Sequence, residues 1–125
     1  MDIHVKHEVV KDSSNKIKFR RFKRGGYEHY NIRLFIEGKD LNEVSFVEYE
    51  LHPTFPNPLR KATNSALGFA IDIWTWGEFE ISVSIHFKNN ETLEIIHSVA
   101  YSNELPADNA NYIDVSPKSY KEVMA

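Results

Sequence analysis

Between residues 79 and 88, apolar and polar side chains alternate without a break. The apolar members are Phe79, Ile81, Val83, Ile85 and Phe87, and a polar residue follows each of them. Successive side chains of a β-strand point to opposite faces, so this pattern predicts a strand with one buried and one solvated face. Such a strand needs a second layer to cover its apolar face.

Shorter segments repeat this two-residue period and are separated by turn-forming residues. The clearest are 47–51 and 31–37, and weaker strands are predicted at 3–10, 17–22 and 93–101. Glycine- and asparagine-containing turns lie between them. No alternation of strands with helices appears, so we expect an antiparallel sandwich or barrel and no parallel sheet.

Two segments interrupt the period. Residues 53–70 are predicted to form a long, stiff loop because they contain three prolines, which cannot donate to a strand ladder. Near the other end, Ser116-Pro117 supplies a helix N-cap and a first-turn proline, so residues 117–124 are predicted to form a short helix. We therefore expect one β-sandwich domain over residues 1–102 and a tail over residues 103–125.

The residue content argues against several classes of site. The chain has no cysteine, which excludes disulfides, thiolate nucleophiles and cysteine-based zinc sites. None of its histidines shows the helical i, i+4 spacing of a zinc motif, and His4 and His7 fall on opposite faces of a strand. No Gly-x-Ser-x-Gly or phosphate-binding glycine loop is present. We expect neither catalysis nor a metal nor a cofactor.

Charge and hydropathy constrain the partners. The net charge of -3 disfavours a nucleic-acid partner. The basic cluster in residues 16–24 is better explained as a solvated strand face than as an edge for an acidic partner. No apolar run is long enough to cross a bilayer, and the first residues lack the apolar segment of a signal peptide. We therefore expect a cytoplasmic protein with no membrane segment.

Two predicted loops concentrate residues suited to recognition. Leu51 ends a strand, and His52, Thr54 and Phe55 follow it in the proline-stiffened loop. Trp76, Gly77 and Phe79 lead from a second loop into the long alternating strand. Loops at one end of a sandwich are common binding sites. Aromatic faces with a hydroxyl and a backbone N–H suit a flat amide that carries a short apolar group.

These two segments resemble the motifs of the YEATS domain family. Leu51-His52-Pro53-Thr54-Phe55 matches its Leu-His-x-Ser/Thr-Phe/Tyr motif, and Trp76-Gly77-Glu78-Phe79 matches most of its Gly-Trp-Gly-x-Phe motif. A weaker match is Gly26-Tyr27-Glu28-His29-Tyr30. The resemblance implies an all-β, immunoglobulin-like antiparallel β-sandwich of about eight strands that reads acetyl-lysine, crotonyl-lysine and related acyl-lysines without catalysing a reaction.

The resemblance also implies a role for each site residue. Phe55 and Trp76 would sandwich the acyl group, and Phe79 would close the pocket wall. Thr54 would hydrogen-bond the side-chain amide, and His52 would orient its hydroxyl. The backbone N–H of Trp76 or Gly77 would meet the acyl carbonyl. The expected rim of the pocket consists of Tyr27, His29, Trp74 and Thr75.

One departure from the family pattern lies beside the site. Thr75 stands where the family has glycine, and glycine is favoured where the backbone takes a positive φ or approaches another group closely. A β-branched residue resists both, so we expect Thr75 to reshape the loop and to narrow or shut the pocket.

The resemblance is to the bacterial branch of the family. The expected partner is therefore an acylated protein or peptide that is not assumed to be a histone. The alternative, from a different functional class, is an interaction scaffold with a degenerate pocket. Such a scaffold would bind unmodified partners through an edge strand or the loop rim.

Overall fold

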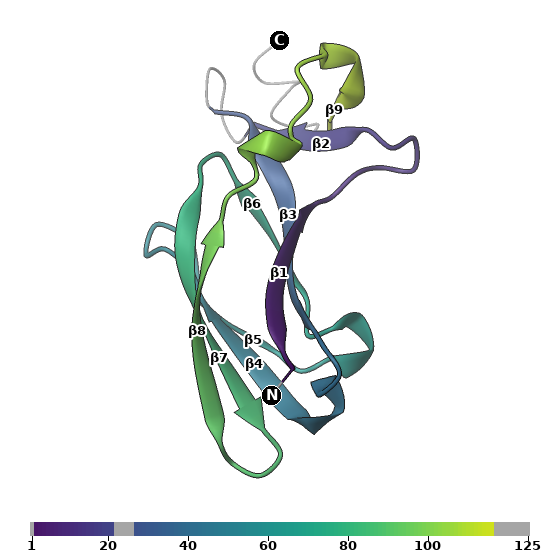
Figure 1. The fold of residues 1–125 in the computed structure, drawn as a ribbon. Coiled ribbons are helices and arrows are strands. Elements are labelled where there is room, and N and C mark those ends of the chain that lie inside the picture. The colour runs from purple at the N-terminus through teal and green to yellow at the C-terminus, as the bar shows by residue number, and fades with distance from the viewer. Residues whose placement is uncertain (1, 22–26, 117–125) are drawn as a thin grey trace.

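The computed structural model describes residues 2–21 and 27–116 of the chain. These residues form nine β-strands in two packed sheets (Figure 1). The first sheet has the strand order β1-β3-β2-β9, and β6 pairs with β3 in the same sheet. The second sheet has the order β5-β4-β7-β8. The predicted β-sandwich is confirmed.

The strands that were predicted from the alternation have bounds close to the expected ones, and further strands complete both sheets. The first sheet contains β1 (His4–Val9), β2 (Ile17–Arg20), β3 (His29–Glu37), β6 (Ile71–Thr75) and β9 (Tyr112–Asp114). The second contains β4 (Val44–Glu50), β5 (Leu59–Ala62), β7 (Phe79–Phe87) and β8 (Thr92–Val99). Four short 3-10 helices connect them: η1 (Leu41–Glu43), η2 (Ser65–Leu67), η3 (Ser102–Glu104) and η4 (Asn109–Asn111).

The core lies between the inward faces of the two sheets. Alternate residues of β7, namely Ile81, Val83 and Ile85, are at most 2% exposed. They face the equally buried alternate residues of β3, which include Ile32 and Leu34. Each such side chain stabilises the fold by about 1.5–3 kcal/mol through its burial. The strand that was most regular in the sequence is therefore one of the two central strands of the second sheet.

The prediction of one long loop over residues 53–70 is wrong for part of that segment. Residues 59–62 form β5, which pairs with β4, and residues 65–67 form η2. The prolines all precede β5, and the last of them accepts a hydrogen bond from the Leu51 N–H through its carbonyl at 2.8 Å. Proline is tolerated just before an edge strand, so the proline content hid the strand. No strand was expected at residues 71–75, which form β6.

The chain after residue 102 contributes to the first sheet. Residues 112–114 form β9, which pairs with β2 in parallel, whereas the strand pairs in the rest of the described chain are antiparallel. In Figure 1, β2 and β9 lie at one end of the molecule and the β7–β8 hairpin lies at the other. The helix predicted at residues 117–124 lies outside the described residues. No helix in residues 2–21 and 27–116 is long and apolar enough to cross a membrane.

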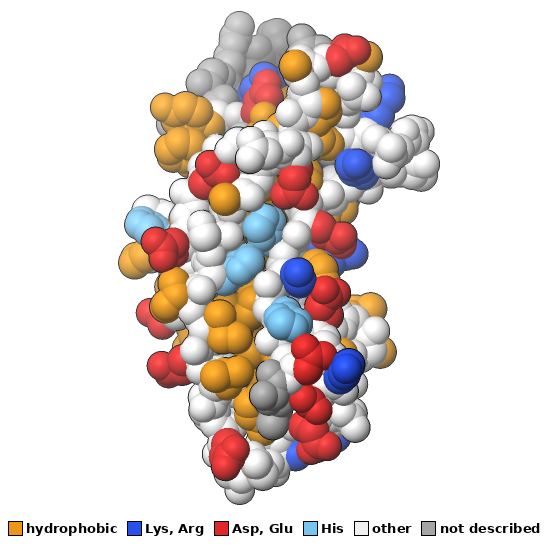
Figure 2. Space-filling model, viewed as in Figure 1, with side chains coloured by type: hydrophobic (Ala, Val, Ile, Leu, Met, Phe, Trp, Pro, Cys, Tyr) orange, Lys and Arg blue, Asp and Glu red, His pale blue; other side chains and the backbone are white. Residues whose placement is uncertain are grey.

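A histidine pair bridges the edge strands β1 and β8 of the two sheets. His7 Nδ1 lies 2.8 Å from His97 Nε2, and His7 Nε2 lies 3.1 Å from the Ala100 carbonyl. Because a carbonyl only accepts, His7 Nε2 carries a proton, and in the neutral pair His97 Nε2 donates to His7 Nδ1. Figure 2 shows histidines gathered on this face above a run of hydrophobic side chains.

This pair makes stability depend on pH. Burial, and then the positive charges of His7 and Lys6, lower the pKa of His97 below its ordinary value of 6.5. The unfolded chain therefore binds more protons at His97, so the stabilisation is complete above about pH 6.5 and is lost as the pH falls. We expect His97→Gln to reduce the loss of unfolding free energy between pH 7.5 and pH 5, measured by urea titration at each pH. An unchanged loss would contradict this assignment.

Candidate functional site

One large cavity opens between the loop that joins β4 to β5, the turn that joins β6 to β7, and the start of β3. Its volume is about 970 Å³, near the upper end of the range for small-molecule sites. All ten residues that the sequence analysis singled out line it: His52, Thr54, Phe55, Trp76, Gly77 and Phe79, and the expected rim residues Tyr27, His29, Trp74 and Thr75. The structure thus brings the two motifs together.

Five further residues line the cavity and were not predicted: Pro56, Arg60, Asp72, Ile73 and Glu78. Three of them belong to β5 and β6, strands that the sequence pattern did not predict. Residues 72–75 of β6 all contribute, although their side chains point alternately to opposite faces. The cavity therefore runs along the edge of β6, with β5 on its other side.

The polar end of the cavity is a histidine–threonine pair. His52 Nδ1 lies 2.9 Å from Thr54 Oγ1, and the Thr54 backbone N–H donates to the same nitrogen at 3.2 Å. Because a backbone N–H can only donate, Nδ1 carries no proton in this arrangement, and the Thr54 hydroxyl donates to it as well. The lone pairs of the hydroxyl oxygen are then left to accept a hydrogen bond from a ligand.

Two hydroxyl groups, those of Thr75 and Tyr101, hold the turn between β6 and β7 in place. The Thr75 hydroxyl donates to the Gly77 carbonyl at 3.0 Å, and the Tyr101 hydroxyl donates to the same carbonyl at 3.2 Å. Burial raises the pKa of Tyr101 to about 12, so its hydroxyl stays protonated and remains a donor. The Gly77 N–H makes only a long contact of 3.4 Å with Thr75 Oγ1. That N–H is therefore available to a ligand.

Thr75 does not shut the cavity. Its side chain is 5% exposed and lies beneath the turn, where it forms the hydrogen bond to Gly77. The backbone of Thr75 does not take a positive φ. Among the described non-glycine residues, those with a positive φ are Asn15, Asn57, Phe69 and Asn90. The conformation that would require glycine at this position is not used. The expected closure of the pocket is therefore not found.

Aromatic rings form the walls. Phe55 packs against Phe79 with ring centroids 5.3 Å apart and planes inclined by 44°. Trp76 stacks on Tyr27 at 4.4 Å and 13°, although both side chains are more than half exposed. The Arg20 guanidinium lies 5.2 Å from the centre of the Trp74 ring. Each ring that lines the cavity is therefore supported by a neighbour.

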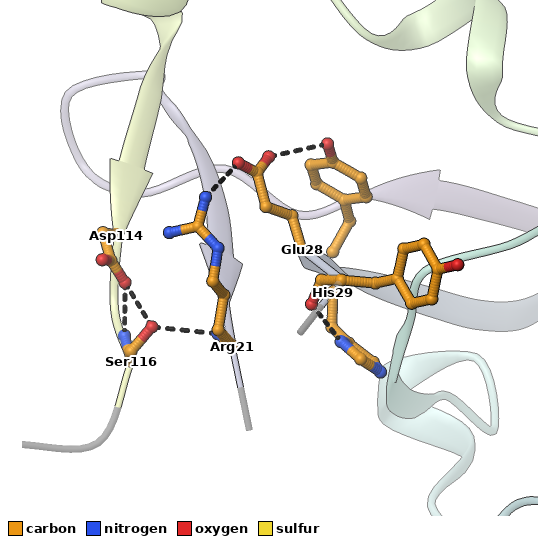
Figure 3. A network of polar contacts seen from close by, with 7 residues as sticks. Arg21, Glu28, His29, Asp114 and Ser116 are labelled. Carbon is orange, nitrogen blue, oxygen red and sulfur yellow. Dashed lines mark hydrogen bonds and ion pairs between the residues drawn. The ribbon is translucent and has the colours of Figure 1, made fainter. Parts of the chain in front are cut away.

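A polar network anchors the segment that carries Tyr27 and His29 (Figure 3). Arg21 donates to Glu28 at 2.6 Å, and the Tyr30 hydroxyl donates to the other carboxylate oxygen at 3.2 Å. His29 points to the other side of the strand, where its Nδ1 donates to the Tyr27 carbonyl at 2.9 Å. Glu28 and Tyr30 thus hold the strand in place, while Tyr27 and His29 line the cavity.

The same network extends to β9. The Ser116 hydroxyl accepts from the Arg21 N–H at 2.9 Å and donates to Asp114 (Figure 3). The Val115 N–H donates to the Phe19 carbonyl at 2.8 Å. Residues 112–116 therefore hold the segment around β2, which in turn pairs with the start of β3 beside the cavity.

The charged groups around the cavity are mostly paired. Asp72 accepts from Arg33 at 3.1 Å. Glu78 accepts from the Ser102 backbone N–H at 3.1 Å, and this hydrogen bond holds the pKa of Glu78 below its ordinary value. In residues 2–21 and 27–116, no group of three or more histidine or acidic side chains is placed to hold a metal ion.

The sequence of the chain is similar to that of a known protein family. A family model described as the prokaryotic YEATS domain matches residues 30–100. The protein AF-9 homolog of Saccharomyces cerevisiae is 29% identical over 107 residues, which cover 76% of this chain and 46% of that protein. The chain thus spans about half the length of this relative.

Solved structures share the fold. The Yaf9 YEATS domain recognizing an H3K122suc peptide aligns with a TM-score of 0.59 and 20% identity, over 83% of this chain and 74% of that chain. The Yaf9 YEATS domain bound to H3K27ac aligns with a TM-score of 0.51 and 21% identity, over 79% and 68%. They confirm the immunoglobulin-like sandwich. Since the family model covers more than half of the sequence, including both motifs of the cavity, this chain belongs to the YEATS domain family.

Proposed function

We propose that this chain is a non-catalytic module that binds acylated lysine in the cavity between the two loops. The observation that carries the proposal is the Thr54 hydroxyl, which donates to His52 and so presents an acceptor between aromatic walls. The side-chain amide of an acyl-lysine offers one N–H donor and one carbonyl acceptor. Its N–H would donate to Thr54, and the Gly77 N–H would donate to its carbonyl.

The aromatic walls suit the acyl group. An amide with its acyl chain is flat and neutral, and it can stack on Trp76 and Phe55. Because Trp76 is 56% exposed, binding would also remove apolar surface from water. A crotonyl group extends the flat π-surface and would add about 0.5–1.5 kcal/mol of stacking over an aliphatic acyl group.

Unmodified lysine is a poorer fit for the same site. Its ammonium group would lose hydration on entry and would need a carboxylate to compensate. Of the two carboxylates that line the cavity, Asp72 is already paired with Arg33, and Glu78 already accepts from the Ser102 backbone N–H through one of its oxygens. An ammonium also has no acceptor, so it could not accept a hydrogen bond from the Gly77 N–H.

The structural relatives support this choice of ligand class. The two Yaf9 structures carry histone H3 peptides named for a succinylated and an acetylated lysine, H3K122suc and H3K27ac. For this chain we propose the acyl-lysine side chain as the recognised group and do not assign the protein that carries it. We further propose that the module acts in the cytoplasm of a prokaryotic cell.

One observation favours an interaction scaffold as a second candidate. Tyr27 and Trp76 stack at the rim with 67% and 56% of their surface exposed. Exposed aromatic patches often mark protein contacts. A scaffold would use this rim without inserting a side chain, so its binding would not depend on acylation.

A calorimetric titration tests the proposal. One lysine peptide is compared in unmodified, acetylated and crotonylated forms, and we expect both acylated forms to bind and the unmodified form to bind at least about 10-fold more weakly. Thr54→Val keeps the shape of the side chain but removes the acceptor. Because the amide N–H would then be buried without a partner, we expect acyl-lysine affinity to fall about 10-fold.

Thr63→Val is the matched control, since Thr63 is exposed and does not line the cavity. It should leave affinity unchanged. Equal binding of all three peptide forms, or full binding by Thr54→Val, would favour the scaffold instead.

A further inference from the structure

Arg60 occupies an unusual position on β5. It pairs with the fully buried Tyr49 of β4 and alternates with the buried Ala62. It is therefore on the inward face of an edge strand, where an apolar residue would be expected. Arg60 is half-buried and lines the cavity beside the loop that carries Thr54 and Phe55.

Two backbone carbonyls hold the Arg60 guanidinium in place. Its Nε donates to the Asn57 carbonyl at 2.6 Å, and its Nη2 donates to the Pro56 carbonyl at 2.8 Å. A guanidinium has five N–H donors in a rigid plane, so these two bonds fix its orientation and leave donors unused by them. Such a planar fork matches a carboxylate, which it can bind through two parallel hydrogen bonds.

The two carbonyls orient the charge of Arg60 but do not neutralise it. In the part of the chain that the structure describes, no carboxylate lies within ion-pair distance of Arg60, whereas Asp72 is paired with Arg33. Glu78, the other acidic residue at the cavity, accepts from the Ser102 N–H. Arg60 is thus an oriented cation without an ion-pair partner among the described residues, in a recess where Asp72 is already paired.

We propose that Arg60 binds a carboxylate of the ligand, so that the cavity prefers acyl-lysine ligands that carry a negative charge next to the amide. This inference rests on the proposed function. The carboxylate could come from the acyl group itself, as in a dicarboxylic acyl chain, or from an acidic side chain next to the modified lysine. A purely structural role for Arg60 is the competing explanation, because inward-pointing charges protect edge strands and the two carbonyl bonds brace the loop.

The experiment compares three peptides of otherwise identical, uncharged sequence. The first carries Nε-butyryl-lysine, the second Nε-succinyl-lysine, and the third Nε-butyryl-lysine followed by glutamate. Butyryl and succinyl chains have the same length, so they differ only in the terminal carboxylate. Each peptide is titrated into the full chain, into Arg60→Gln and into Lys61→Gln. Lys61 is the matched control, because it removes the same charge from the outward, exposed face of the same strand.

We expect the unsubstituted chain to bind one of the two carboxylate peptides about 10-fold more tightly than the neutral butyryl peptide at low salt. The peptide that gains affinity identifies the source of the carboxylate. Arg60→Gln should abolish this preference while changing butyryl affinity by less than about two-fold, and Lys61→Gln should keep the preference.

Three results would overturn the inference. The first is equal affinity for the neutral and the charged peptides. The second is an Arg60→Gln variant that weakens all three peptides alike, which would assign Arg60 to bracing the loop. The third is no binding of any acylated peptide, which would instead defeat the proposed function on which the inference rests.

Discussion

Replacing Trp76 with alanine is expected to weaken acyl-lysine binding at least about 30-fold, the loss typical of a central aromatic contact. The ring forms one wall of the cavity, and a stacked acyl group would lose both its apolar contact and its shelter from water. The same change should cost the fold little, because the side chain is 56% exposed. Its stack on Tyr27 contributes about 0.5–1.5 kcal/mol, which bounds the loss of stability.

Binding and unfolding are measured on the same sample, by titration with an acetyl-lysine peptide and by urea denaturation. Ile96→Ala is the matched control, because Ile96 is 64% exposed and lies on β8, away from the cavity. It should leave affinity unchanged. Equal losses of affinity in the two variants would mean that Trp76 contributes only general surface hydrophobicity.

Phe69→Ala should be among the most destabilising substitutions in the chain, at about 3–5 kcal/mol. The side chain is 1% exposed and fills the core. Its carbonyl accepts a hydrogen bond from the buried Tyr49 hydroxyl at 2.7 Å. Small domains have about 5–15 kcal/mol of total stability, so this loss would be a large share of the whole. Urea denaturation measures it directly.

The backbone conformation of Phe69 permits a second test, of whether this residue is strained. Its φ is +53°, a conformation that costs a bulky residue free energy and costs glycine almost none. Within a helix or strand, a protein with glycine is usually less stable than the same protein with alanine by about 0.5–1 kcal/mol. At residue 69 we expect the reverse, with Phe69→Gly at least as stable as Phe69→Ala. If Phe69→Gly were instead less stable than Phe69→Ala, backbone strain at residue 69 would be negligible.

Leu67→Ala provides the control for both variants. Leu67 is 64% exposed and lies two residues away in η2, so its truncation should change stability by less than about 0.5 kcal/mol.

The sequence predicted those strands whose two faces differ in polarity. β7 was evident because its apolar residues face the core while the residues between them face solvent. β5 was hidden because it is short, lies at an edge and follows a proline-rich segment. β9 could not be predicted because it has three residues and pairs in parallel with β2, a contact that local periodicity does not encode.

The sequence predicted those cavity residues that belong to the two compact motifs, at 51–55 and 76–79. The pair formed by His52 and Thr54 is local in sequence, so its proximity follows from the loop. Arg60 and Asp72 were missed because they lie on edge strands that were not assigned. The expected closure by Thr75 was wrong, because the backbone of Thr75 does not take a positive φ and its side chain lies beneath the turn, where it holds Gly77.

The most direct test of the acyl-lysine site is a proton–nitrogen correlation spectrum recorded during titration with acetylated and unmodified forms of one lysine peptide. We expect the acetylated peptide to shift the amide signals of Thr54 and Gly77 and the indole signal of Trp76, and the unmodified peptide to leave them in place. Equal shifts with both peptides, or shifts confined to the edge strands β1 and β8, would contradict it.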